Sequence, residues 1–491
     1  MKRVRFIEPM SQRRSLYNRH IRYMPLMGPV LLATLLARQG YDAVVYNENL
    51  TGSVLDDQKV RDDLCGSDLV GISIMTASAT RGYHIADVLR AEGGCRIAFG
   101  GVHATFCPEE ALRHADVVVT GEGESVIREI ADGTIPSGIV AGQTVENLEE
   151  LPLPDFRLVH GFDRLWSEPE AKSLHPYPLV TSRGCPYNCR YCSVSALFGS
   201  RFRFRSARKV AEDLRCLREM GYRRFFFYDD NFTADRKRAM EILASAAELG
   251  ITWTAQVRLD CSWLDPAERQ RCDSRLLEEM RRSGGDMLLV GYETIDEETA
   301  RRWKKGYRGR GTLERRCAED TRILRETGMW IHGMFILGPD HSEETADGIV
   351  RFARRSGIDS IQISALTPFP GTALFEESKR RLLLSSFPDD WDFFDGTHQV
   401  FAHARMGVRR FHEKLLQAHR EFYRCASLLH PQRIQKALRG PGSAGRKLAA
   451  LVRTAVSAER ELREWRREIR DYLRLIEARR LRAGSCEAVV G

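Results

Sequence analysis

Residues 183–192 read RGCPYNCRYC, which places three of the chain's 12 cysteines within eight residues. The stretch follows a short predicted strand and precedes any helical pattern, so we expect a loop at the end of that strand. Three soft thiolates at this spacing suit an iron–sulfur cluster. A zinc site would need a fourth protein ligand, and no second Cys/His pair lies nearby at finger-like spacing. The sequence therefore predicts that Cys185, Cys189 and Cys192 ligate a cluster and are not three unrelated buried cysteines.

The segment around this loop, residues 178–375, alternates strand and helix patterns. Strands are predicted at residues 179–182, 224–228, 252–257, 287–292, 330–337 and 360–366. Helices are predicted near residues 207–220, 236–249, 275–283, 313–327 and 343–355. Six such strands predict an incomplete (β/α) barrel with its chemistry at the C-terminal mouth.

Residues 1–142 show the same alternation with a shorter period. Strands are predicted at residues 2–8, 41–47, 69–74, 95–100 and 116–120, and helices at 28–39, 80–91 and 124–132. The pattern predicts a doubly wound, Rossmann-like domain, whose ligands bind beyond the carboxyl ends of the strands. Glycines at those ends let backbone approach a ligand, or simply form turns. A proline-containing linker, residues 143–177, separates this domain from the barrel.

The cysteine loop at the first strand of a partial barrel resembles the radical S-adenosylmethionine (SAM) superfamily. The resemblance implies a [4Fe–4S] cluster held by the three cysteines, with SAM on the open iron. It assigns Tyr191 to a place beside adenine, and Gly291 and Glu293 to the fourth-strand G-x-E that contacts SAM. Residues 226–232, which contain Asp229, are similar to the acidic ending of the second strand. Residues 332–338 and 366–372 resemble the fifth and sixth strands.

For two sites on the barrel, the sequence allows more than one role. Arg258, at the end of a predicted strand, is either a partner of the methionine carboxylate of SAM or a surface arginine. Asp229 and Asp230 either orient ribose or substrate, or cap a helix. The motifs identify no catalytic residue of the protein.

The first domain resembles the cobalamin-binding subfamily, through residues 25–29, 100–105, 108–110 and 116–124. The resemblance implies a corrin ring between the sheet edge and the barrel mouth. The implied contacts are residues at strand ends: Ser73, Thr76, Gly100, Gly101, Thr105, Gly121 and Glu122. The sequence has no D-x-H-x-x-G motif, so His103 is expected to be a loop histidine and not a cobalt ligand. The same absence allows a remnant domain that binds no corrinoid.

Together these resemblances imply a cobalamin-dependent radical SAM methyltransferase. It would act on an unactivated carbon through a 5′-deoxyadenosyl radical and methylcobalamin. One alternative is a radical SAM enzyme for cyclisation, ring rearrangement or carbon–carbon coupling, with or without cobalamin. The other is a non-enzymatic cobalamin or Fe–S binding module. An electron donor of the flavodoxin or ferredoxin type is implied by the family.

Composition excludes several other classes of protein. With 491 residues and 43% hydrophobic content, the chain can build about three compact domains and is not dominated by disorder. Twelve cysteines are too dilute for a disulfide scaffold, and neither a signal peptide nor a span of about 20 apolar residues is present. The composition predicts a cytoplasmic protein.

Residues 376–491 form the predicted helical C-terminal region, interrupted by a breaker at residues 440–443. From residue 401 onward there are 21 Lys plus Arg and 9 Asp plus Glu, so the positive charge of the chain belongs to this tail. In its last helical pattern one stripe is apolar, at Leu462, Trp465, Ile469, Tyr472, Leu473 and Ile476. The other face carries Arg463, Arg466, Arg467, Arg470 and Arg474. The pattern predicts either a charged helix packed on the barrel, or a surface for an anionic substrate or for peripheral membrane contact.

The substrate is expected to be a small or lipid-like molecule. Nucleic acid is not expected, because the body of the chain is slightly acidic.

Overall fold

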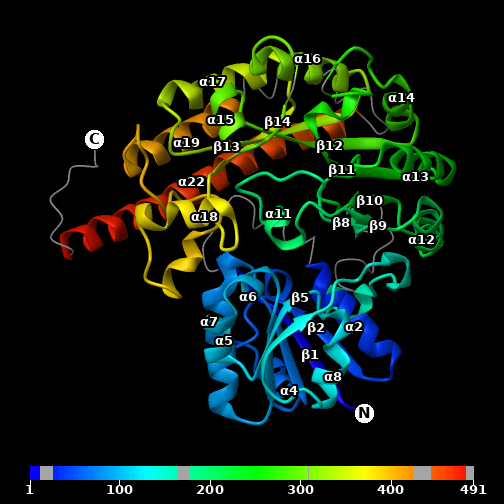
Figure 1. Ribbon diagram of the computed structural model, residues 1–491, viewed down its shortest axis with the longest axis vertical. Coiled ribbons are helices and arrows are strands. Elements are labelled where there is room, and N and C mark those ends of the chain that lie inside the picture. Colours follow the sequence, from blue (N-terminus) through cyan, green and yellow to red (C-terminus); the bar gives the residue numbers. More distant parts are fainter. Residues whose placement is uncertain (12–25, 163–175, 267, 308, 425–443, 483–491) are drawn as a thin grey trace.

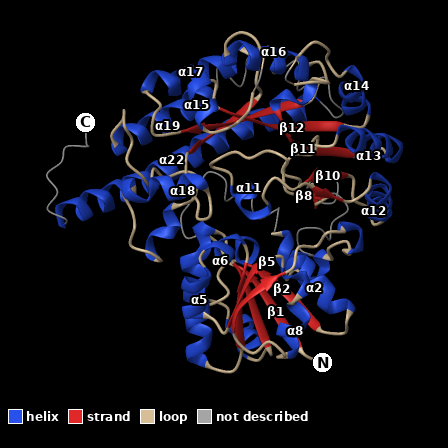
Figure 2. Cartoon of the chain, viewed as in Figure 1, coloured by secondary structure: helices blue, strands red, loops and turns tan. Residues whose placement is uncertain are grey.

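The computed structural model describes residues 1–11, 26–162, 176–266, 268–307, 309–424 and 444–482, with the side chains of residues 459–479 in the last helix. The chain forms two lobes, each built on a six-stranded parallel sheet (Figure 1). Helices flank both sheets (Figure 2). This confirms the predicted α/β class, with a Rossmann-like N-terminal domain, a partial barrel and a helical C-terminal region.

The first sheet has the strand order β2-β1-β3-β4-β5-β6, with parallel neighbours throughout. Its strands are β1 (Arg3–Glu8), β2 (Asp42–Asn47), β3 (Leu69–Ser73), β4 (Arg96–Gly100), β5 (Val117–Gly121) and β6 (Gly138–Gly142). Five of these strands were predicted to within one residue at each end. The sixth, β6, was not predicted, because an edge strand that alternates between half-buried and exposed positions gives only a weak hydrophobic signal.

Helices cover both faces of this sheet. In Figure 1, α2 (Met27–Arg38) and α8 (Ile127–Asp132) lie on one face, and α5 (Ala79–Glu92) lies on the other with α4 (Gln58–Cys65) beside it. The shorter helices of this lobe are α3 (Glu48–Thr51), α6 (Val102–Phe106) and α7 (Pro108–Ala111). Because β1 lies between β2 and β3, the chain winds outward in both directions from it. A ligand crevice is expected at that switch point.

The second sheet has the strand order β7-β10-β11-β12-β13-β14. Its strands are β7 (Tyr177–Leu179), β10 (Arg224–Phe227), β11 (Thr252–Arg258), β12 (Gly285–Glu293), β13 (Trp330–Leu337) and β14 (Ser360–Ala365). The helices of this lobe are α11 (Ser193–Phe198), α12 (Ala207–Glu219), α13 (Arg236–Leu249), α14 (Ser274–Arg282), α15 (Glu297–Arg302), α16 (Leu313–Arg325) and α17 (Glu343–Arg355). Strands β7 and β14 stand at the two ends of the strand order, so the barrel is incomplete.

The predicted first barrel strand, residues 179–182, is wrong in its placement. Strand β7 ends at Leu179, and Ser182 belongs to β8 (Ser182–Arg183), which pairs antiparallel with β9 (Arg203–Phe204). The amides of Thr181 and Ser182 donate to Asp229 Oδ1, at 2.7 and 2.9 Å. The carboxylate therefore takes these amides out of the parallel ladder and turns the chain toward the cysteine loop.

The C-terminal region adds α18 (Ala373–Ser378), α19 (Val408–Phe422) and α22 (Ala444–Arg482). Helix α19 packs on α17 and β14, and α22 packs on α19. The predicted stripe of α22 is confirmed, since each of its six apolar residues is at most 9% exposed. The five arginines of the other face are exposed. The predicted breaker at residues 440–443, and Pro25 of the N-terminal motif, lie outside the described residues.

Within the described part of the chain, no helix is long and apolar enough to be a candidate for crossing a bilayer.

Candidate cofactor site between the two lobes

A cavity of about 560 Å³ lies between the carboxyl ends of the first sheet and the barrel. Five of the seven residues predicted to contact cobalamin line it: Ser73, Gly100, Gly101, Gly121 and Glu122. From the barrel side its lining includes Ser182, Arg183, Tyr228, Asp229, Asp230 and Gln256. One cavity thus joins the glycine-rich edge of the first lobe to the start of the cysteine loop.

The glycines of this edge fit a ligand that approaches backbone. A Cβ atom built on Gly28 or Gly100 would meet no heavy atom within 4 Å, so the backbone at both positions faces open space in the cavity. At Gly101, where φ is +96°, a Cβ atom would lie 2.8 Å from the carbonyl oxygen of Ile74. Only glycine permits that turn without strain. The lining therefore fits a cofactor held by backbone contacts, as expected for cobalamin.

The other two predicted cobalamin contacts, Thr76 and Thr105, are not among the lining residues. Thr105 Oγ1 donates to the Gly101 carbonyl at 2.9 Å and accepts from the Gly121 amide at 3.1 Å, so it ties two strand ends together. Thr76 is buried beside His103. Both threonines support the cavity wall from behind.

His103 is fully buried and also lies behind the lining. Its Nε2 lies 3.3 Å from Glu110 Oε1, which also accepts hydrogen bonds from Tyr83 and Trp391. Trp391 comes from the C-terminal region, 281 residues beyond Glu110 along the chain, and packs edge-on against the His103 imidazole. The network joins the C-terminal region to the first lobe and leaves His103 outside the cavity.

Glu122 is the centre of an ion-pair cluster between the lobes. It pairs with Arg183 at 2.9 Å and with Arg203 at 2.7 Å, while Glu124 pairs with Arg183 at 2.5 Å. Burial disfavours the ionised form of Glu122, but the hydrogen bond from Arg203 and the charge of Arg183 outweigh burial and lower its pKa. Arg183 directly precedes the cysteine loop, so this pair anchors the start of the loop to the first lobe.

The three cysteines follow β8, and all three are free and half-buried. Burial raises the pKa of Cys185 and of Cys192, as it does for thiols without a bound metal. Among the described residues, no three Cys, His, Asp or Glu side chains converge as the ligands of a single ion would. A cluster spreads its cysteines over separate irons. Three thiols on one loop therefore fit a cluster with one open iron.

Residues of β11 and of the segment after α15 hold this loop in place. The Arg258 guanidinium lies 3.7 Å from the ring centre of Tyr187 and makes two hydrogen bonds to Asp260, at 3.0 and 2.9 Å. The Tyr191 ring packs edge-on against Trp303 at 5.5 Å between centres. Arg258 is thus neither exposed nor unpaired, and it supports the cysteine loop from below through Tyr187.

Glu293 ends β12 with a φ of +64°, and the register between β12 and β13 shifts at this point. A Cβ atom on Gly291 would lie 2.7 Å from Glu293 Oε1, so the glycine of G-x-E makes room for the glutamate. Lys305 Nζ donates to the same oxygen at 3.0 Å, and Tyr307 donates to the Gly291 carbonyl. These two partners were not predicted. The only signal for them is the sequence WKKGY at residues 303–307, which carries no recognised spacing.

Asp229 and Asp230 have different surroundings. Asp229 is buried and accepts the amides of Thr181 and Ser182 that turn the chain toward the cysteines. Asp230 accepts from the Gly184 amide at 3.2 Å, and burial together with the charge of Asp229 raises its pKa to about 6. Both aspartates line the cavity, but Asp229 accepts hydrogen bonds from two backbone amides and Asp230 from only one.

Comparisons with known proteins match both lobes. The model of the B12 binding domain matches residues 23–131, and that of the radical SAM superfamily matches residues 179–353, so the two cover more than half of the chain. Bacteriochlorophyllide d C-12(1)-methyltransferase of Chlorobaculum tepidum is 29% identical over 86% of this chain and 88% of its own length. Hopanoid C-2 methylase of Rhodopseudomonas palustris is 25% identical over 73% of this chain and 65% of its own length. The structure of the radical SAM methyltransferase TsrM from Kitasatospora setae, with cobalamin and [4Fe–4S] cluster bound, has the same fold. Its TM-score is 0.63 at 14% identity, over 94% of this chain and 99% of that chain.

Proposed function

This chain belongs to the radical SAM enzymes that carry an N-terminal B12-binding domain, and on that premise we propose that it methylates an unactivated carbon of its substrate. The observation that carries the proposal is the single cavity lined by both the glycine-rich edge and the barrel mouth. When bound, the [4Fe–4S] cluster and SAM supply a substrate-activating radical, and cobalamin supplies the methyl group. The protein brings these groups to one enclosed site.

Cys185, Cys189 and Cys192 would hold the cluster. Glu293, fixed by Lys305, is positioned as an acceptor for the ribose hydroxyls or the amino group of SAM, and charge assistance strengthens such bonds. Tyr191 would pack beside adenine. The residues that would contact the cluster or SAM come from one strand end, that of β12, and from the loop after β8, and none of them is among the residues that line the cavity.

Two predicted SAM contacts are better described as positioning residues. Asp229 fixes the backbone that leads into the cysteine loop, and Arg258 supports Tyr187 within it. On the cobalamin side, Ser73, Gly100, Gly101 and Gly121 would contact the cofactor. The surrounding turns and the barrel would be held in position by Thr76, Thr105 and Glu122.

The test uses anaerobically purified protein with reductant, cobalamin and SAM carrying a deuterated methyl group. Formation of 5′-deoxyadenosine together with transfer of label to a lipid-like acceptor supports the proposal. Label-free product with 5′-deoxyadenosine formed would indicate cyclisation, rearrangement or coupling. Cys189→Ala should lose the cluster absorbance and the activity together. Unchanged function in that variant would favour a non-enzymatic binding module.

The substrate and partners follow from the same premise. The cavity lining is rich in apolar side chains, such as Phe6, Leu31 and Val119, which suits a small lipid-like substrate. In a reducing cytoplasm, a flavodoxin or ferredoxin would supply the electron. The basic C-terminal region would bring the enzyme to a membrane surface.

A further inference from the structure

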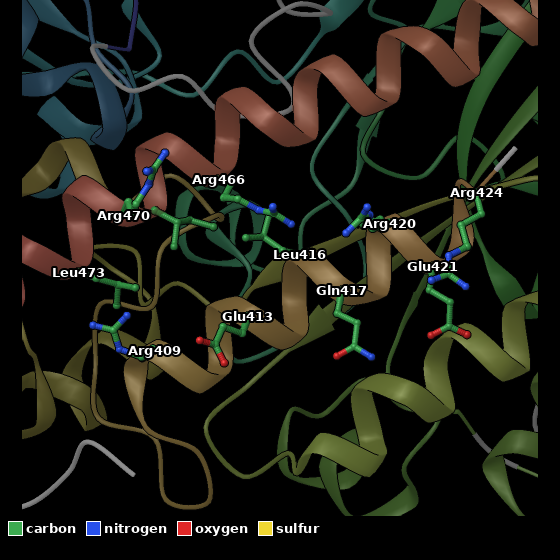
Figure 3. A pocket seen from close by; sticks show the side chains of 11 residues that line it. Arg409, Glu413, Leu416, Gln417, Arg420, Glu421, Arg424, Arg466, Arg470 and Leu473 are labelled. Carbon is green, nitrogen blue, oxygen red and sulfur yellow. The ribbon is translucent and has the colours of Figure 1, made fainter.

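A groove of about 710 Å³ runs between α19 and α22, and it shares no lining residue with the cofactor cavity. Arg409 of α19 and Arg424, two residues beyond the end of this helix, mark the two ends of the groove. Its apolar floor is formed by Leu416, Ile469 and Leu473. Both walls carry arginines, shown in Figure 3.

Four arginines of these walls have no acidic partner. Among the described residues, neither a hydrogen bond nor an ion pair involves Arg420 of α19, Arg424 just beyond that helix, or Arg466 and Arg470 of α22, and all four are exposed. In Figure 3 the side chains of Arg420 and Arg466 extend toward one another from opposite walls. Two cations that face each other without a carboxylate between them favour an anion in the groove.

The carboxylates of α19 do not neutralise this cluster. Glu413 and Glu421 point away from α22 in Figure 3. Glu413 pairs with Arg410 at 3.3 Å, and Glu421 pairs with Arg354 of α17 at 3.5 Å. The positive field of the groove therefore remains available to a ligand.

We propose that this groove, together with its four unpaired arginines, is a docking surface for the phosphate headgroups of acidic phospholipids. Guanidinium groups match phosphate oxygens in pairs, and each cation near an acidic membrane surface adds to binding. The inference rests on the proposed membrane contact and not on methyl transfer.

Other anionic partners fit the groove less well. A partner helix would need several apolar anchors, but Ile469 and Leu473 are only 4% and 8% exposed, so the half-buried Leu416 is the main apolar residue that the described floor offers. Single-stranded nucleic acid would stack its bases on aromatic rings, and none of the described residues that line the groove is aromatic. Phosphate headgroups need only the arginines.

The sequence between Arg424 and the described side chains of α22 has the same character. Residues 425–458 contain six Lys or Arg and no Asp or Glu. This segment begins directly after Arg424, at one end of the groove. In the sequence, six cations without a single carboxylate thus follow Arg424, a pattern that favours a broad anionic surface such as a membrane.

The test is sedimentation of the full-length, anaerobically purified protein with vesicles. One set is phosphatidylcholine alone, and the other contains about one-third phosphatidylglycerol. The groove variant replaces Arg420, Arg466 and Arg470 with Gln. The matched control removes three exposed arginines of α22 that do not line the groove: Arg463→Gln, Arg467→Gln and Arg474→Gln. Equal melting temperature and equal cluster absorbance establish that both variants are folded.

Wild type and control should bind the acidic vesicles, and the groove variant should bind on the order of a hundredfold more weakly. Added salt should weaken the binding of wild type. Equal binding by the groove variant, or equal binding of wild type to neutral vesicles, would overturn the proposal. The proposal would also be overturned if inorganic phosphate saturated the groove, or if the protein retained single-stranded RNA, while no vesicles were bound. Formation of 5′-deoxyadenosine in these variants reports separately on the proposed reaction.

Discussion

Replacing Lys305 by Met should damage SAM binding far more than replacing the adjacent Lys304. Lys305 Nζ lies 3.0 Å from Glu293 Oε1, and the two side chains are only 7% and 15% exposed. Lys304 is exposed. The two variants lose the same charge one residue apart, so their comparison isolates the contact with Glu293.

The magnitude follows from the burial of the pair. Removing one partner of a buried ion pair costs about 3–5 kcal/mol, because the other charge is left without compensation. For SAM, the loss is that of one oriented, charge-assisted hydrogen bond, about 1.5–3 kcal/mol. We therefore expect Lys305→Met to weaken SAM binding by roughly 10- to 150-fold, and Lys304→Met to change it less than about twofold.

The assay is equilibrium binding of SAM to the reconstituted enzyme under anaerobic conditions, with melting temperature measured in parallel. The double variant Glu293→Gln/Lys305→Met removes the buried charge along with its partner. It should regain much of the melting temperature lost in Lys305→Met, but none of the SAM affinity. Wild-type SAM affinity in Lys305→Met would refute the reasoning. Recovery of affinity in the double variant would show that Lys305 acts only on stability.

Three further predictions concern stability and the contact between the lobes. Glu122→Gln should destabilise the interface by about 3–5 kcal/mol and weaken cobalamin retention in equilibrium dialysis; Glu146→Gln, at an exposed ion pair, is the control and should change neither. Burial raises the pKa of Glu8 from 4.5 to about 8, so the native state keeps a proton that the unfolded chain releases. The wild-type melting temperature should fall between pH 5 and pH 8, and a Glu8→Gln variant with the same pH dependence would contradict this. Trp465→Ala should cost about 3–5 kcal/mol in the packing of α22, seen as a lower melting temperature, whereas Arg467→Gln should stay within about 0.5 kcal/mol.

The parts of the fold that could be predicted are those in which one residue pattern decides the outcome. Buried parallel strands such as β3 and β13 read as apolar runs, and amphipathic helices such as α17 read as stripes. The exceptions have local causes. Strand β6 lies at an edge, where burial is partial, and β7 stops early because Asp229 captures the amides that follow it. The latter contact joins residues 48 positions apart, which no local pattern can indicate.

For the same reason, the site residues could be predicted from local patterns but their distant partners could not. Cysteine spacing and the G-x-E pattern are local, so they identify Cys189 and Glu293 directly. The interlobe pair between Arg203 and Glu122 spans 81 positions, and nothing in the surrounding sequence distinguishes Arg203 from other arginines.

The C-terminal region shows most clearly that a sequence pattern predicts burial but not charge pairing. Its apolar stripe predicts which face of α22 is buried, because that depends only on helical period. Its net charge cannot show which arginines are neutralised. Arg409 is paired with Glu477, 68 positions away, whereas Arg420 and Arg466 have no acidic partner among the described residues. The groove is therefore a property of how two helices pack, and a charge count over the same residues would assign equal weight to paired and unpaired arginines.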